Sequence, residues 1–269
     1  MRSSIADYEV LEALPGPTHG GARYLCRPPA RLAWDDPVEV AEVAVGDDRW
    51  PQWTDGMARL AAVPGPDLRA LIETGPDRAG TGAFISCESA PGGSLASPAP
   101  AGAAALDRAA RIEAVATAAR AAHALHEAGL AHGSIGPESV LLTRRGPVLS
   151  PPVLDRPEGL AARWSTGEVL SAVDPDVLRG EAPSRSSDIW SLGATLHRVL
   201  SDRSLYPGIG ADQPVTAVQR VMFTRPELDP ALEGEVRDLI ARCLTPDPAE
   251  RPQTAAEVAQ AITALGVGR

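Results

Sequence analysis

One short segment gathers polar side chains that could take part in chemistry: residues 132–142, which read HGSIGPESVLL. His132, Ser134 and Ser139 are its candidates for proton transfer or metal binding. A serine hydroxyl does not ionise near neutral pH, so it cannot accept a proton as a carboxylate base does. A hydroxyl is also a weak, neutral ligand for Mg²⁺, which prefers carboxylate oxygens. The two serines therefore argue against acid–base or metal chemistry at their own positions.

Such chemistry would need acidic or thiol side chains brought together from elsewhere in the chain. The carboxylates that could form a compact cluster are those of Asp155 with Glu88 or Glu138. The cysteines match neither a metal-binding spacing nor a disulfide framework, because they are far apart and odd in number. Free cysteines suit a reducing cytoplasm. The three are Cys26, Cys87 and Cys243.

Length and charge exclude several classes of protein. Of the 269 residues, 44% are hydrophobic, which is enough for a sizeable core and argues against global disorder. The formal net charge is −10 and there are no basic runs, so nucleic acid and anionic lipid are poor candidate partners. No apolar run approaches the ~20 residues that cross a bilayer. We therefore expect a cytoplasmic chain that binds no nucleic acid and does not insert into membranes.

The first 90 residues predict short strands and one helix. The segment VEVAEVAV is rich in β-branched residues and is the clearest strand of the chain. Glycine- and proline-containing turns separate it from its neighbours. The expected strands are 8–12, 22–26, 38–45, 68–73 and 82–87, and the expected helix is 53–62.

After the turn at residues 90–93 the pattern becomes helical. A long alanine-rich stretch has its larger apolar residues on one face, as a buried helix does. Near the end of the chain, Thr254 followed by Glu257 forms a capping-box pattern. The expected helices are 106–128, 187–200, 230–244 and 254–265, with a hairpin at 139–142 and 147–149 and an irregular loop at 150–173.

Four segments resemble the motifs of bacterial Ser/Thr protein kinases, in the order and spacing of that family. Residues 132–142 resemble the catalytic loop, and AFISCESAPGGSL at 83–95 resembles the hinge between the lobes. DPDVLRGEAPSRSSDIWSLGATLHRVL at 174–200 is similar to the APE motif and the helix after it. LTPDPAERPQTAAEV at 244–258 resembles the late C-terminal signature. The resemblance covers the chain nearly end to end.

The resemblance implies an α+β, two-lobed, protein-kinase-like fold. Residues 1–90 would form the N-lobe, a small antiparallel β-sheet with one helix. Residues 91–269 would form the larger, mainly helical C-lobe, with the hinge at about 86–93.

The resemblance also implies which residues support the fold. Asp188 would accept hydrogen bonds from the backbone of the catalytic loop, and His132 would be a structural member of that loop. Arg251 would pair with the acidic residue of the APE motif, here Asp176. Removing one partner of such a buried pair typically costs about 3–5 kcal/mol.

The positions that carry out phosphoryl transfer in this family hold other residues. Ala41 stands where the family has the phosphate-binding lysine. In the catalytic loop, Gly133 replaces the arginine, Ser134 the aspartate base and Ser139 the metal-binding asparagine. Pro151 aligns with the aspartate of the DFG motif, the main Mg²⁺ ligand. Together these replacements remove most of the electrostatic stabilisation on which this reaction depends.

These replacements predict a pseudokinase that is not an enzyme and uses no metal or cofactor. It would act as a scaffold or regulatory module that binds a protein partner, for which the loop at 150–173 is a candidate surface. At the hinge, Cys87 aligns with the gatekeeper. Glu88 aligns with the first hinge residue, whose carbonyl receives the adenine amino group in the family. We expect no useful ATP binding, because a triphosphate would meet no cation.

Two alternatives remain at this stage. The chain could be a nucleotide sensor, or a kinase-fold transferase whose catalytic groups have moved to other positions.

Overall fold

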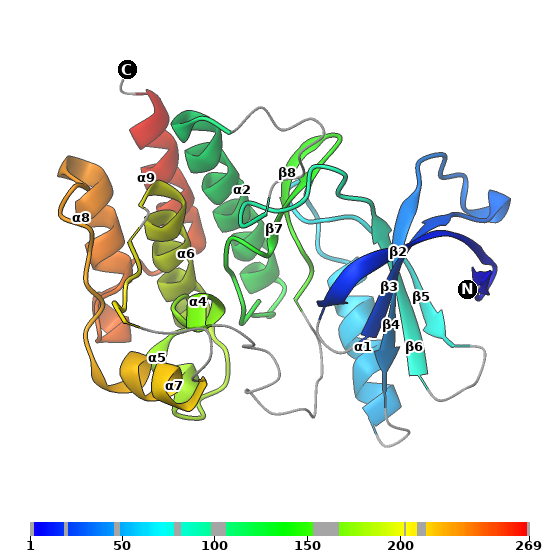
Figure 1. Ribbon diagram of the computed structural model, residues 1–269, viewed down its shortest axis with the longest axis horizontal. Coiled ribbons are helices and arrows are strands. Elements are labelled where there is room, and N and C mark those ends of the chain that lie inside the picture. The colour runs from blue at the N-terminus through cyan, green and yellow to red at the C-terminus, as the bar shows by residue number, and fades with distance from the viewer. Residues whose placement is uncertain are drawn as a thin grey trace.

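The computed structural model has a sheet and one helix on one side and a group of helices on the other (Figure 1). It describes residues 3–18, 21–45, 49–77, 82–97, 106–152, 167–201, 203–208 and 214–267. The prediction of an α+β fold with two lobes is confirmed. The boundary between the lobes near residue 90 stays a prediction.

The strand lobe is a single antiparallel sheet in the order β1-β2-β3-β4-β6-β5. Its helix, α1 (Trp50–Ala61), connects β4 to β5 and buries Trp53, Met57 and Leu60. One short 3₁₀ helix, η1 (Ala30–Leu32), precedes β4. The strands are β1 (Ser4–Ile5), β2 (Tyr8–Thr18), β3 (Gly21–Arg27), β4 (Val38–Ala44), β5 (Leu71–Pro76) and β6 (Gly82–Glu88).

The two faces of β4 have different characters because successive side chains of a strand point to opposite sides. Val38 and Val40 are fully buried in a small apolar cluster that includes Tyr8 and Phe84. Glu39 lies between these valines in the sequence, so its side chain points to the other face. That face is the one that matters for the candidate site.

The helical lobe is built around α2, which packs against α6 and α9. A short hairpin of β7 and β8 lies beside α2. The elements are α2 (Arg108–Glu127), β7 (Val140–Thr143), β8 (Gly146–Leu149), α4 (Gly167–Leu170), α5 (Pro175–Leu178), α6 (Arg185–Leu200), α7 (Pro214–Phe223), α8 (Gly234–Cys243), η3 (Pro248–Glu250) and α9 (Ala255–Val267).

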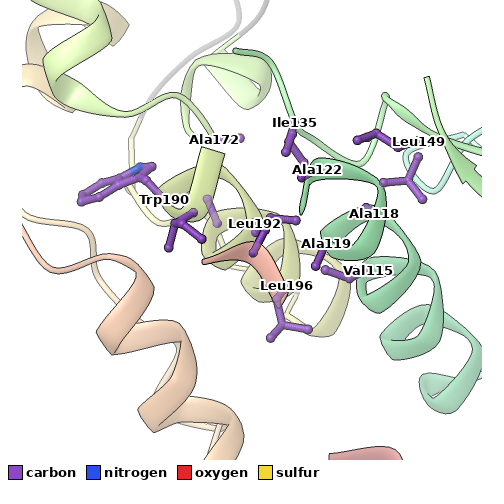
Figure 2. Close-up of a cluster of buried hydrophobic side chains, with 14 of the residues drawn as sticks. Val115, Ala118, Ala119, Ala122, Ile135, Leu149, Ala172, Trp190, Leu192 and Leu196 are labelled. Atoms are coloured by element: carbon purple, nitrogen blue, oxygen red, sulfur yellow. The ribbon is translucent and has the colours of Figure 1, made fainter. Parts of the chain in front are cut away.

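Small side chains let the helices of this lobe approach closely. Figure 2 shows Ala118, Ala119 and Ala122 of α2 in the same apolar cluster as Leu192 and Leu196 of α6. Interaxial distance depends on side-chain size, so an alanine-rich face permits a short one. Gly193 shows the same requirement, because a Cβ there would lie 2.4 Å from the Cβ of Cys243 on α8.

A strand-like contact joins the two lobes. Leu68, just before β5, forms a parallel bridge with Leu149 at the end of β8. The Arg69 amide donates to the Leu149 carbonyl at 2.8 Å, and the Leu149 amide donates to the Asp67 carbonyl at 2.8 Å.

Among the described residues, no helix is both long enough and apolar enough to span a membrane.

Candidate functional site

The loop at residues 132–139 is anchored by Asp188, which is fully buried in the first turn of α6. Its Oδ2 accepts the His132 amide at 2.7 Å, and its Oδ1 accepts the Gly133 amide at 2.8 Å. The Nε2 of His126 lies 2.9 Å from Oδ2. A buried carboxylate needs such donors, because an unpaired charge is costly away from water. The anchor fixes the loop's backbone where α2 and α6 meet.

In the anchored loop, the residue after His132 has a left-handed backbone conformation. Gly133 has a φ of 72°, a conformation that favours glycine over residues with a Cβ. His132 is buried, and its Nε2 lies 2.9 Å from the Ser150 carbonyl. His132 thus links the loop to the segment after β8, which is a structural contact.

The side chains at the family's base and metal positions do not fit a magnesium site. The Ser139 hydroxyl donates to the Gly136 carbonyl at 2.9 Å and accepts the Gly136 amide at 3.0 Å, so it is used within its own turn. Ser134 is half-buried, and Pro151 has no side-chain donor atom. Since Mg²⁺ needs carboxylate oxygens in near-octahedral order, these positions cannot supply its ligands.

The acidic cluster that the sequence suggested is only partly described. Asp155 lies outside the described residues. Glu138 is exposed, whereas Glu88 is buried at the end of β6. Within the described ranges, no group of three or more His, Cys, Asp or Glu side chains could hold a metal ion.

Arginine–glutamate pairs lie on the face of the sheet that carries Ala41. Residues directly opposite one another in antiparallel strands share a face. Ala41 lies opposite Arg23 of β3, and Glu39 lies opposite Cys87 of β6. Arg23 Nε donates to Glu39 Oε1 at 2.6 Å. The chain has no lysine at all, because every one of its 25 basic residues is an arginine, so arginine is the cation available here.

Glu39 also binds a second arginine, which is buried. Arg69 is 8% exposed, and its Nη2 donates to Glu39 Oε2 at 2.7 Å. Burial opposes ionisation of Glu39, but the charges of Arg69 and Arg23 outweigh it and hold the pKa of Glu39 below its usual value. This face therefore carries an ion-pair network beside Ala41, the position where the resemblance implies a phosphate-binding lysine.

The residues expected at the hinge, Cys87 and Glu88, lie beside the same network. Arg69 Nε donates to the backbone carbonyl of Glu88 at 2.8 Å. Arg145, from the turn between β7 and β8, donates from Nε to Glu88 Oε2 at 2.8 Å. The neighbouring Cys87 is buried, and burial raises the pKa of its thiol to about 11, so it is a thiol near neutral pH.

The partner of Arg251 differs from the one expected. Arg251 is 3% exposed and donates from Nη1 to Asp174 Oδ2, not to Asp176. Asp174 caps the N-terminus of α5 by accepting the Asp176 amide, which places its carboxylate at the buried end of the helix. Asp176 is half-exposed and pairs with Arg179 at 2.6 Å instead. The expected pairing with Asp176 is corrected accordingly.

Three charged residues of this site, Glu39, Arg69 and Arg145, were not predicted from the sequence. The signal that could have found the first two is a charge within an apolar strand-like run, VEVAEVAV for Glu39 and DLRALIE for Arg69. Charged residues at buried strand positions require partners. The sequence alone does not say which arginine pairs with which glutamate, because Glu39 and Arg69 are 30 residues apart.

Comparison with known proteins identifies relatives of the same class. The protein kinase domain family matches residues 78–262. Serine/threonine-protein kinase PknK of Mycobacterium bovis is 32% identical over 148 residues, which are 53% of this chain and 13% of PknK. Serine/threonine-protein kinase PknA of Mycobacterium tuberculosis is 30% identical over 154 residues, 56% of this chain and 35% of PknA. The matches thus span about a third or less of these relatives.

These matches correct one prediction. The sequence predicted that the chain is not an enzyme, whereas the family and the relatives it resembles are named protein kinases. The prediction that the chain is not an enzyme is therefore wrong.

Proposed function

This chain belongs to the protein kinase domain family, and on that premise we propose that it acts as a regulatory module that binds a protein partner. The observation that carries the proposal is the contrast within one loop. Its backbone is held by Asp188, while the resemblance implies that Ser134 and Ser139 stand at the positions of the base and a metal ligand. A rigid framework of this kind can present a surface without depending on the reaction. Free, buried cysteines support a cytoplasmic location as part of the proposal.

The loop at 150–173, proposed from the sequence as a partner surface, lies largely outside the described residues. Elsewhere, helix α7 carries the two most exposed large apolar side chains of the described residues, Val215 at 70% and Phe223 at 76%. Single exposed apolar residues are common on protein surfaces, so these two do not by themselves define a binding surface. Substituting them tests whether a partner binds at α7.

The test begins with the purified full chain as bait in an extract of its native host. A candidate partner is then purified and mixed with the chain, and the mass of the complex is measured by light scattering. We expect a stoichiometric complex that Val215→Ser with Phe223→Ser weakens and that Leu11→Ser, on the strand lobe, leaves unchanged. No stoichiometric complex with any purified candidate would contradict the proposal.

A second candidate function is phosphoryl transfer to Ser or Thr by groups other than those of the family pattern. The names of the relatives favour it. The test is transfer of labelled phosphate from ATP to the chain itself and to a generic acceptor, with Mg²⁺ or Mn²⁺. If Ser134→Ala changes the rate of this transfer by less than about twofold, the result would support catalytic groups at other positions. A true base contributes about 10²–10⁴-fold to the rate.

A further inference from the structure

Arg69 donates a hydrogen bond to the backbone carbonyl of Glu88, the first residue of the expected hinge. In the kinase family, the carbonyl of the first hinge residue receives the adenine amino group, and here that residue is Glu88. Its carbonyl accepts Arg69 Nε at 2.8 Å, and its amide donates to the Ala70 carbonyl at 3.0 Å. Both backbone groups of Glu88 are therefore bonded within the chain.

The side chain of Glu88 is held from the helical lobe. Arg145 binds its Oε2, and the same guanidinium donates from Nη2 to the Leu68 carbonyl at 2.8 Å and from Nη1 to the Pro66 carbonyl. One arginine of the β7–β8 turn thus reaches three groups of the strand lobe. Oε1 of Glu88 is buried and has no hydrogen-bond partner among the described residues, so this carboxylate is held through Arg145 at Oε2.

The contacts form a continuous chain across the hinge. Arg145 joins the helical lobe to Glu88, Arg69 joins Glu88 to Glu39 of β4, and Glu39 joins Arg23 of β3. Hydrogen bonds to charged groups are stronger than neutral ones, and Arg69 is almost fully buried. We call Arg69, Arg145, Glu88 and Glu39 the hinge bridge.

We propose that the hinge bridge holds the two lobes together without a nucleotide, with Arg69 taking the carbonyl that a purine amino group would otherwise use. The proposal concerns how the lobes are joined, so it does not depend on the proposed partner-binding role.

The turn that carries Arg145 supplies a matched control. Arg144 is its neighbour and also reaches the strand lobe, where it donates to Asp36 at 2.7 Å, but both side chains are more than half exposed. Exposed pairs contribute little, because water and salt screen them. Arg144→Met and Arg145→Met therefore remove one charge each from the same turn, but only Arg145→Met removes the hydrogen bonds to Glu88, Leu68 and Pro66.

The experiment measures hydrogen exchange of the Arg69, Glu88 and Leu149 amides in the full chain. We expect Arg145→Met to speed exchange of these amides about tenfold, and Arg144→Met to change it less than about twofold. Arg145→Lys, which keeps the charge but loses the forked geometry, should lie between them. Amides of α8, which lies away from the hinge, should exchange at the wild-type rate in all three variants.

Adenosine is the second probe. Millimolar adenosine should leave exchange of the wild-type Glu88 amide unchanged, because the Glu88 carbonyl is already bonded to Arg69. Equal effects of Arg144→Met and Arg145→Met would overturn the proposal. So would slowing of Glu88 exchange by adenosine, which would mean that a nucleoside and not Arg69 completes the hinge.

Discussion

Two regions of this molecule bury charge in different ways. In the helical lobe, Asp188 accepts two backbone amides of the loop, as the kinase resemblance implies, and also lies against His126. In the strand lobe, Glu39 is satisfied by two arginines that the kinase pattern does not contain. The first arrangement fixes a loop, whereas the second occupies the face of the sheet that carries Ala41. Backbone donors thus stabilise the buried carboxylate of one region, and side-chain ion pairs stabilise that of the other.

The strongest expected effect lies in the helical lobe, at the pair of Arg251 and Asp174. Arg251→Met would leave Asp174 buried and unpaired and should lower the free energy of unfolding by about 3–5 kcal/mol. Arg251 also lies over the Trp190 ring, with 5.0 Å between its Cζ and the ring centroid. Urea unfolding measures the loss. The control, Arg179→Met at the half-exposed Asp176, should cost under about 1 kcal/mol, and equal losses would contradict the assignment.

The next largest effect is expected in the strand lobe, at the pair of Arg69 and Glu39. Arg69→Met should cost about 3 kcal/mol, at the low end for a buried pair, because Arg23 still compensates Glu39. Adding Glu39→Met should recover most of that loss, since two apolar side chains can replace a buried ion pair. Urea unfolding of both single variants and the double variant forms the cycle. Additive losses would mean that the two residues do not form a coupled pair.

Asp188→Asn tests the loop anchor with a nearly isosteric change. The amide keeps one accepting oxygen but loses the charge that three donors share, so we expect a loss of about 2 kcal/mol. Hydrogen exchange should speed up at the His132 and Gly133 amides and stay unchanged at Glu88. Faster exchange at Glu88 would show that the two regions are not independent.

The smallest expected effect depends on pH. Burial lowers the pKa of His197, against the opposing charge of Asp229, and its Nε2 accepts the Asp229 amide at 3.0 Å. The unfolded chain therefore binds the proton more strongly, so His197 contributes stability that is present above about pH 6.5 and is lost as the pH falls. Unfolding at pH 7 and pH 5 should show a smaller loss in His197→Gln than in wild type. Identical losses would rule out this contribution.

Local patterns predicted much of the fold. The helix expected at 106–128 is observed as α2 (Arg108–Glu127), and the strand expected at 38–45 is observed as β4 (Val38–Ala44). Strong periodicity and β-branched content gave these signals. The sequence did not predict the ten-residue α7, which begins at Pro214. It also did not predict β1, α4 or α5, which are only two to four residues long, and α4 lies within the expected loop at 150–173. Such short elements depend on tertiary contacts more than on their own propensity.

The site was harder to predict because its contacts join distant residues. Motif spacing located Asp188 and Ser134, which lie in segments that resemble the family. It could not show that Arg69 bonds the Glu88 carbonyl, or that Asp174 takes Arg251 in place of Asp176. Both depend on where a side chain points after folding, since Asp174 both caps α5 and accepts Arg251.

Titration of the full chain with ATP, with and without Mg²⁺, tests most directly whether the ion-pair network leaves no binding site for the phosphates. Thermal unfolding is the readout, because a ligand at about 100 times its dissociation constant adds about 2.7 kcal/mol and raises the midpoint by about 5 °C or more. We expect the same midpoint at millimolar ATP whether or not Mg²⁺ is present. A rise of several degrees that requires Mg²⁺ would contradict the account.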